Sequence, residues 1–161
     1  MIRTTVLALA LAGATSSATA QELVFGGGIV DFHSNAGQAA IVEVEYRFAP
    51  FTRLGPFDVA FGVAGAVHDT GDLWVGAGLV NTARLGGAWF LESSVMPGYY
   101  DAGRANTDLG HAFEFRSQIA VGYDLTPTSS LSLAFQHKSN AGLGDINPGL
   151  NALTLRLHRK F

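Results

Sequence analysis

The sequence contains no cysteine in its 161 residues, and only 14% of its residues are charged. Without cysteine there is no disulfide framework, no thiol nucleophile and no zinc–thiolate site. A typical soluble domain has about 25% charged residues, so this chain is unusually poor in charge. Lysine and arginine number 10 against 13 aspartates and glutamates, which argues against a nucleic-acid-binding face. Hydrophobic residues make up 48%, too many for a disordered chain, so we expect contact with something other than water.

Long hydrophobic runs are also missing, and the one apolar run, near the N-terminus, is too short for a transmembrane helix. Arg3 precedes it, small residues follow it, and Ala18-Thr19-Ala20 has the A-x-A form of a cleavage site. This pattern predicts a secretory signal peptide over residues 1–20 that is cleaved after Ala20. Residues 21–161 are then expected to form a single exported domain.

Within residues 21–161, apolar and polar residues alternate with a period of two, which predicts β-strands with two different faces. Val42 and Val44, for example, share one face of their segment, while Glu43 and Glu45 share the other. Residues typical of turns separate the segments. The eight segments lie near residues 23–33, 42–48, 57–68, 73–81, 88–96, 113–121, 131–139 and 153–161.

Alternation alone fits two kinds of all-β protein. A soluble sandwich or lipocalin-like barrel buries its apolar face, whereas a transmembrane barrel turns apolar side chains to lipid and polar ones to the lumen. Three features favour the membrane barrel: charges grouped within strands (residues 43–47 and 114–116), small residues on the polar face of residues 60–64, and a last strand that ends in Phe161. We therefore predict an eight-stranded antiparallel transmembrane β-barrel of the bacterial outer membrane, with both termini on the periplasmic side.

The candidate chemistry lies at the end of the seventh segment, which this topology places near the outer leaflet. His137 and Ser139 continue the apolar face of Leu131, Leu133 and Phe135, so both would face lipid side by side. A serine needs an adjacent base to become a nucleophile, and histidine is the usual base. His33 and Ser34 are adjacent and would point to opposite faces of a strand, which argues against a second such pair. The remaining histidines (His68, His111 and His158) are isolated in the sequence, so we predict no metal site.

The cluster His137-Lys138-Ser139-Asn140-Ala141-Gly142-Leu143, followed by Asn147-Pro148-Gly149 and an amphipathic last strand, resembles the PagL family. Members of this family are lipid A 3-O-deacylases of the Gram-negative outer membrane. The resemblance implies a serine esterase that hydrolyses the ester-linked 3-hydroxyacyl chain at position 3 of lipid A, without a cofactor or metal. It implies that Ser139 is the nucleophile and His137 the base. It also implies an oxyanion hole formed by Asn140 and the backbone N–H of Gly142, with Asn147 contacting the substrate.

One position departs from the family pattern, which has an acid fourteen residues after the histidine. Here that position is Asn151. An acid orients the imidazole and stabilises its charge, whereas an amide can only orient it, as in Cys-His-Asn enzymes. We expect Asn151 to be the orienting residue, with Asp145 in the preceding loop as the second candidate.

Two other functions remain compatible with the sequence. A small outer-membrane barrel can have a structural or adhesive role without catalysis, and a soluble barrel can bind a lipid in its interior. The expected partner of the enzyme is lipopolysaccharide, the lipid of the outer leaflet, and no nucleic acid is expected. The sequence leaves open whether the protein forms a homodimer.

Overall fold

A computed structural model describes residues 21–31 and 39–161 of the chain. The predicted signal peptide, at residues 1–20, and the His33–Ser34 sequence lie outside these described residues. No helix within the described ranges is long and apolar enough to cross a membrane.

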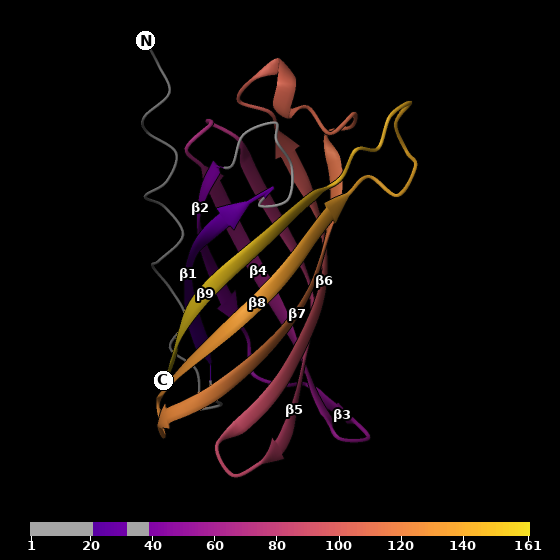
Figure 1. Cartoon of the computed structure of the whole chain (residues 1–161). Helices are drawn as coiled ribbons and strands as arrows, with labels where there is room; N and C mark the ends of the chain where they lie inside the picture. Colours follow the sequence, from indigo (N-terminus) through magenta and orange to yellow (C-terminus); the bar gives the residue numbers. More distant parts are fainter. Residues whose placement is uncertain (1–20, 32–38) are drawn as a thin grey trace.

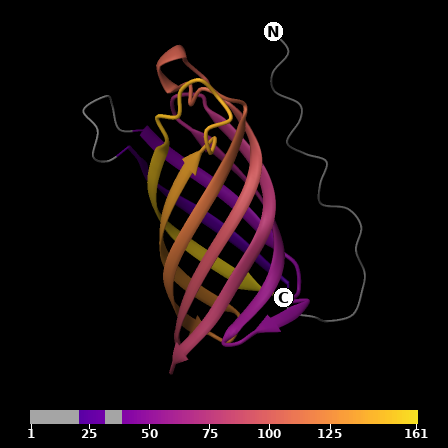
Figure 2. The ribbon, with the colours of Figure 1, turned by 90° about the vertical axis from the view of Figure 1, so that its right-hand side faces the viewer.

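The strands form one antiparallel sheet that curls into a barrel, with strands tilted around its axis (Figures 1 and 2). Pairing of β2 with β4 closes the sheet, so each long strand has two neighbours. A ninth strand, β3 (Thr52–Leu54), is short and pairs only with β4. The eight barrel strands are β1 (Glu22–Val30), β2 (Ala39–Arg47), β4 (Phe57–His68), β5 (Leu73–Gly86), β6 (Trp89–Asp101), β7 (Phe113–Thr126), β8 (Ser129–Ser139) and β9 (Leu150–Lys160). The predicted eight-stranded antiparallel barrel is confirmed.

The apolar faces of the strands point outward, as expected for a barrel that faces lipid. In β2, Val42 and Val44 are 63% and 44% exposed. The alternating residues Glu43 and Glu45 are only 3% and 1% exposed. The same reversal holds along β6 and β7, where Glu92, Glu114 and Arg116 are buried inside the barrel. A soluble lipid-binding barrel would have the opposite arrangement, so the structure excludes that alternative.

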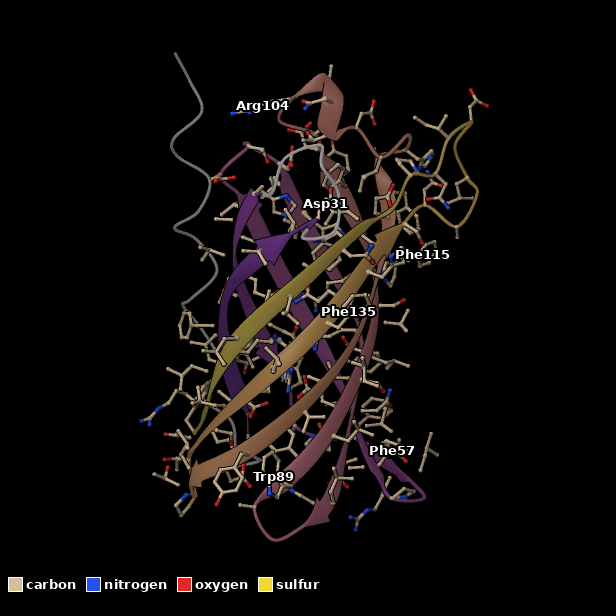
Figure 3. The ribbon with its side chains drawn as sticks, in the orientation of Figure 1. Asp31, Phe57, Trp89, Arg104, Phe115 and Phe135 are labelled. Carbon is tan, nitrogen blue, oxygen red and sulfur yellow. The ribbon has the colours of Figure 1, made fainter. Side chains whose placement is uncertain are left out.

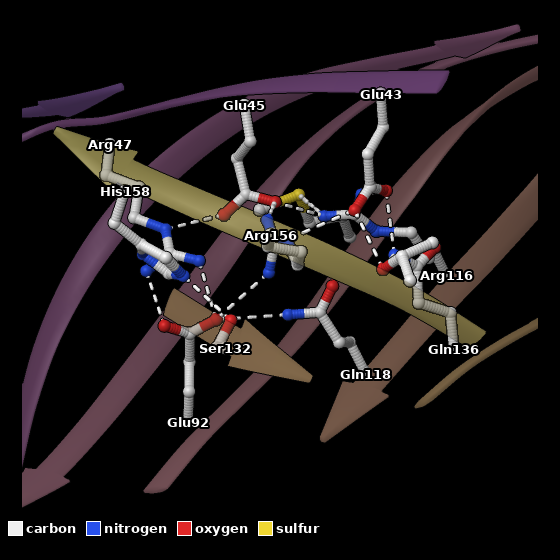
Figure 4. A network of polar contacts seen from close by, with 12 residues as sticks. Glu43, Glu45, Arg47, Glu92, Arg116, Gln118, Ser132, Gln136, Arg156 and His158 are labelled. Carbon is white, nitrogen blue, oxygen red and sulfur yellow. Dashed lines mark hydrogen bonds and ion pairs between the residues drawn. The ribbon is translucent and has the colours of Figure 1, made fainter. Parts of the chain in front are cut away.

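The centre of the barrel is filled by an ion-pair network from β2, β6, β7 and β9 (Figure 4). Arg156 contacts all three acids of the network: Glu45 at 2.8 Å, Glu92 at 3.0 Å and Glu43 at 3.1 Å. Arg47 and Arg116 contribute the two other guanidinium groups, with contacts of 2.6 Å to Glu92 and Glu45 respectively. Within this network three acids are thus matched by three arginines, and their contacts tie opposite walls of the barrel together.

Removing one arginine from this network is expected to leave buried carboxylate charge uncompensated. We predict that Arg156→Met lowers the free energy of unfolding by about 3–5 kcal/mol, the cost of breaking a buried ion pair from one side. Urea unfolding in detergent micelles measures this. The control is Arg53→Met, since Arg53 pairs with Asp58 on the surface, with side chains 65% and 44% exposed. This variant should lose less than about 1 kcal/mol. Equal losses in both variants would contradict the role given to the network.

The two ends of the barrel differ. Gln21 donates its N–H to the carbonyl of Phe161 at 3.2 Å, so the start and end of the described strands meet at the end that also carries β3 (Figure 1). The loop with the 3₁₀ turn η1 (Ala105–Thr107) and the loop at residues 140–149 lie at the other end.

At this loop end of the barrel, Asp72 accepts hydrogen bonds from Thr70, Gly103 and Thr107. Burial opposes ionisation, but these bonds outweigh it and hold the pKa of the Asp72 carboxyl below its ordinary value.

Candidate active site

His137 and Asn151 face each other across neighbouring strands on the outer surface of the barrel. They are register partners in the pairing of β8 with β9. Nδ1 of His137 lies 2.8 Å from Oδ1 of Asn151. An amide oxygen can only accept, so this contact assigns the proton of the neutral imidazole to Nδ1 and leaves Nε2 free to act as a base. The backbone N–H of Asp31 donates to the carbonyl of Asn151 at 2.8 Å, which fixes this part of β9 against the chain that follows β1.

Ser139 lies two residues beyond His137 on the same face of β8 and is half-buried like it. No hydrogen bond joins the two side chains within the described part of the molecule. Bonds between nucleophile and base are often long or misaligned without substrate and tighten only in its complex. The arrangement therefore supplies the nucleophile–base–orienter order of acyl-transfer sites, with Ser139, His137 and Asn151 on one lipid-facing surface.

Gly149 packs against the imidazole from the loop that precedes β9. Its φ is +67°, and a Cβ atom at this position would lie only 2.9 Å from Cε1 of His137. Two features therefore require glycine at position 149: the left-handed backbone and the close approach of the imidazole ring.

Asn140 holds the loop at residues 140–149 in place and is completely buried. Its Nδ2 donates to the carbonyls of Leu109 and Ile146 at 2.9 and 2.8 Å, and its Oδ1 accepts the N–H of Gly142 at 2.9 Å. The predicted oxyanion donors, Asn140 and Gly142, are thus bonded to each other or to backbone in this arrangement. The backbone N–H of Asn140 in turn donates to Oδ1 of Asn147 at 3.1 Å. Asn147 is exposed, and this bond directs its oxygen inward and leaves its NH₂ group available.

Comparisons with known proteins identify the family of the chain. A model of the family described as "Lipid A 3-O-deacylase (PagL)" matches residues 58–160. The chain belongs to the PagL family. "Lipid A deacylase PagL" of Bordetella bronchiseptica is 32% identical over 88 residues, which are 55% of this chain and 44% of that protein. The matched part thus spans less than half the length of this relative.

The fold of this PagL-family protein is shared with solved structures. "Crystal structure of the outer membrane enzyme PagL" aligns with a TM-score of 0.67 and 16% identity, over 86% of this chain and 98% of that one. Neisserial surface protein A aligns with a TM-score of 0.55 and 12% identity, over 89% and 98% of the two chains. Family membership and the exposed apolar surface together identify the chain as an outer-membrane β-barrel.

Three charged residues of this PagL-family protein, Asp145, Lys138 and Arg104, lie on or near the loops at the site end of the barrel. Asp145 is exposed in its loop and makes no contact with His137 among the described residues. Lys138 points into the barrel, where its Nζ lies 5.9 Å from the centre of the Trp74 ring. Arg104 is exposed beside η1. Of the two candidate orienting residues, only Asn151 therefore touches the imidazole.

Two histidines that are isolated in the sequence have partners in the structure. Nδ1 of His68 lies 3.0 Å from Oδ2 of Asp72, and Nε2 of His158 lies 2.7 Å from Oγ of Ser132. The partners come from a following turn and a neighbouring strand, so the spacing of the histidines in the sequence does not indicate these contacts. Both partners of the Ser132–His158 pair are buried inside the barrel, at 2% and 0% exposure, away from the lipid-facing surface.

Proposed function

We propose that this protein is a serine esterase that hydrolyses the 3-O-linked 3-hydroxyacyl ester of lipid A. The observation that carries the proposal is the 2.8 Å contact of His137 with Asn151, on the same outward face as Ser139. Membership of a family described by this activity supports the choice of reaction. The outward placement supports the choice of substrate, because a nucleophile on this face meets membrane lipids rather than solutes.

The reaction follows from the protonation state of the imidazole. Nε2 of His137 takes the proton of the Ser139 hydroxyl as Oγ bonds to the ester carbonyl carbon. The bond from that carbon to the sugar oxygen then breaks, and Nε2 returns the proton to the leaving oxygen. Water, deprotonated by the same Nε2, next attacks the carbonyl carbon of the acyl-serine ester. The bond from that carbon to Oγ of Ser139 breaks, Nε2 returns the proton to Oγ, and the hydroxy acid is released. Each step balances with no cofactor and no metal.

The negative oxygen formed during this attack needs a hydrogen-bond donor. We propose that the NH₂ group of Asn147 supplies it, because its oxygen is held by Asn140 and its amide hydrogens are not used within the described contacts. Asn140 and Gly142 then act indirectly, by keeping the loop that carries Asn147 in position.

The test is incubation of detergent-purified protein with lipid A that carries a 3-hydroxyacyl chain at position 3. We expect release of that 3-hydroxy fatty acid and a lipid A lighter by one hydroxyacyl group, both detected by mass spectrometry. Release from position 2, or of the secondary acyl chains, would contradict the proposed regiochemistry. Absence of any release would favour a non-catalytic barrel.

Close packing of Gly149 on His137 gives a further prediction. Gly149→Ala should displace the imidazole and lower kcat/KM for deacylation by roughly 10- to 100-fold, since a shift of about 1 Å at a reacting group has that effect. The control is Gly55→Ala at the opposite end of the barrel. Gly55 also has a positive φ, +59°, but nothing lies within 4 Å of a Cβ atom there. The two variants share the backbone strain, so equal activities would show that the contact with the imidazole is unimportant.

A further inference from the structure

Ser117 is an exposed hydroxyl on an otherwise apolar stretch of the lipid-facing surface. The outward side chains of β7 are Phe113, Phe115, Ser117, Ile119, Val121 and Tyr123. A hydroxyl that faces hydrocarbon without a partner costs free energy. Two other outward polar side chains form a hydrogen bond with each other: Nδ2 of Asn81 donates to Oγ of Ser93 at 3.4 Å. Ser117 has no hydrogen-bond partner of this kind within the described residues.

Strand register places Ser117 directly beside the proposed active site. It is the partner of His137 in the pairing of β7 with β8, and the next pair along is Phe115 with Ser139. Cβ atoms of directly opposed residues lie about 4.5–5.5 Å apart. His137 is thus flanked by two polar side chains on one outward row, Ser117 from β7 and Asn151 from β9. The next outward pair along β7 and β8, further from Ser139, is apolar and consists of Ile119 and Phe135.

An acyl chain attached at Ser139 would run over these rows toward the middle of the barrel. Figure 3 shows Phe115 near the loop end and Phe135 further toward the middle. Residues on one face of a strand repeat about every 6.7 Å, so the Ser117 row is the first that the chain meets beyond Ser139. A hydroxyl on the third carbon of the chain lies only two carbons from the ester carbonyl. With a hydrogen bond of about 2.8 Å, that hydroxyl reaches the Ser117 row.

We propose that Ser117 binds the 3-hydroxyl of the acyl chain and makes the site selective for 3-hydroxyacyl esters over unsubstituted ones. This inference rests on the proposed function, because it assumes that the acyl chain lies below Ser139. Ser117 is a specificity-determining residue in this account and takes no part in the proton transfers. One hydrogen bond of this kind corresponds to roughly a tenfold preference.

Two synthetic esters that differ only in the 3-hydroxyl test the proposal, p-nitrophenyl 3-hydroxydecanoate and p-nitrophenyl decanoate. We expect the wild-type protein in detergent micelles to prefer the hydroxylated ester roughly tenfold in kcat/KM. Ser117→Ala should lower kcat/KM for the hydroxylated ester roughly tenfold more than for decanoate and so lose the preference, and Ser117→Thr should keep it. Ser93→Ala is the matched control, since Ser93 is another outward serine on the neighbouring strand. Equal loss on both esters in Ser117→Ala would overturn the proposal and indicate an effect on His137.

A binding measurement separates this inference from the esterase activity itself. In the Ser139→Ala background, which removes the nucleophile, calorimetry compares the binding of 3-hydroxydecanoate and decanoate to the barrel in micelles. We expect roughly tenfold tighter binding of the hydroxy acid, abolished by adding Ser117→Ala. Equal binding of the two acids would overturn the proposal even if the wild type cleaves lipid A. A preference that depends on Ser117 would support it even if no ester is cleaved.

Discussion

Replacement of Ser139 by alanine is expected to abolish deacylation of lipid A, with a loss of about 10⁴-fold or more. In the proposed mechanism the Ser139 hydroxyl is the protein group that bonds to the carbonyl carbon of the substrate, so the first step is lost without it. His137→Ala should lose a similar amount, and the double variant should be no worse than either single one, because nucleophile and base act as a unit. Initial rates of fatty-acid release measure all three.

The matched control for this prediction lies inside the barrel. Oγ of Ser132 lies 2.7 Å from Nε2 of His158, whereas no hydrogen bond joins Ser139 to His137 among the described residues. Ser132 is buried inside the barrel, where no lipid ester can reach it. Ser132→Ala should therefore keep full activity. Loss of activity in Ser132→Ala and its retention in Ser139→Ala would place the chemistry in the lumen and contradict the account.

Restoring an acid at position 151 is expected to increase the rate. Asn151→Asp keeps the shape of the side chain that contacts Nδ1 of His137 and adds a negative charge next to the imidazole. The charge stabilises the imidazolium that forms as Ser139 attacks, so we expect kcat to rise by about tenfold or more. The same charge favours the protonated ring before reaction. The pH below which activity is lost should therefore move upward, and the pH profile of kcat/KM measures this shift.

Asp145→Asn provides the control for the variant at position 151. Asp145 is exposed and makes no contact with His137 in the described structure, so its neutralisation should leave both rate and pH profile unchanged. A large loss in Asp145→Asn, together with no gain in Asn151→Asp, would identify Asp145 as the acid in the complex with substrate.

Much of the fold could be predicted from the sequence because each strand carries its own signal. Alternation in residues 42–47 separates the valines from the charges, and closure of the barrel sends the charges inward. Strand lengths were predicted less well. β5 and β7 continue to Gly86 and Thr126, beyond the last strongly alternating residues, because pairing with neighbours extends them. The three-residue β3 was not predicted, since so short a strand has no periodicity to detect.

Some residues of the candidate site could likewise be predicted from the sequence, and others could not. His137 and Ser139 share a face because of their spacing alone, and the resemblance to PagL pointed to Asn151, which does contact His137. Their roles in catalysis stay predictions. Ser117 could not be found in this way, because strand register depends on turns and barrel closure rather than on any one segment. The hydrogen bond from Asn140 to the carbonyl of Leu109 could not be predicted either, because the two residues are 31 positions apart in the sequence.

Mass spectrometry of lipid A from a Gram-negative host that produces the protein tests the central claim most directly. The host lipid A should carry a 3-hydroxyacyl chain at position 3, and parallel cultures should produce wild type and Ser139→Ala at equal levels in the outer membrane. We predict that wild type yields lipid A lighter by that one hydroxyacyl chain and that Ser139→Ala leaves the lipid unchanged. Identical lipid A from the two cultures, whether intact or shortened in both, would contradict a lipid A esterase that acts through Ser139.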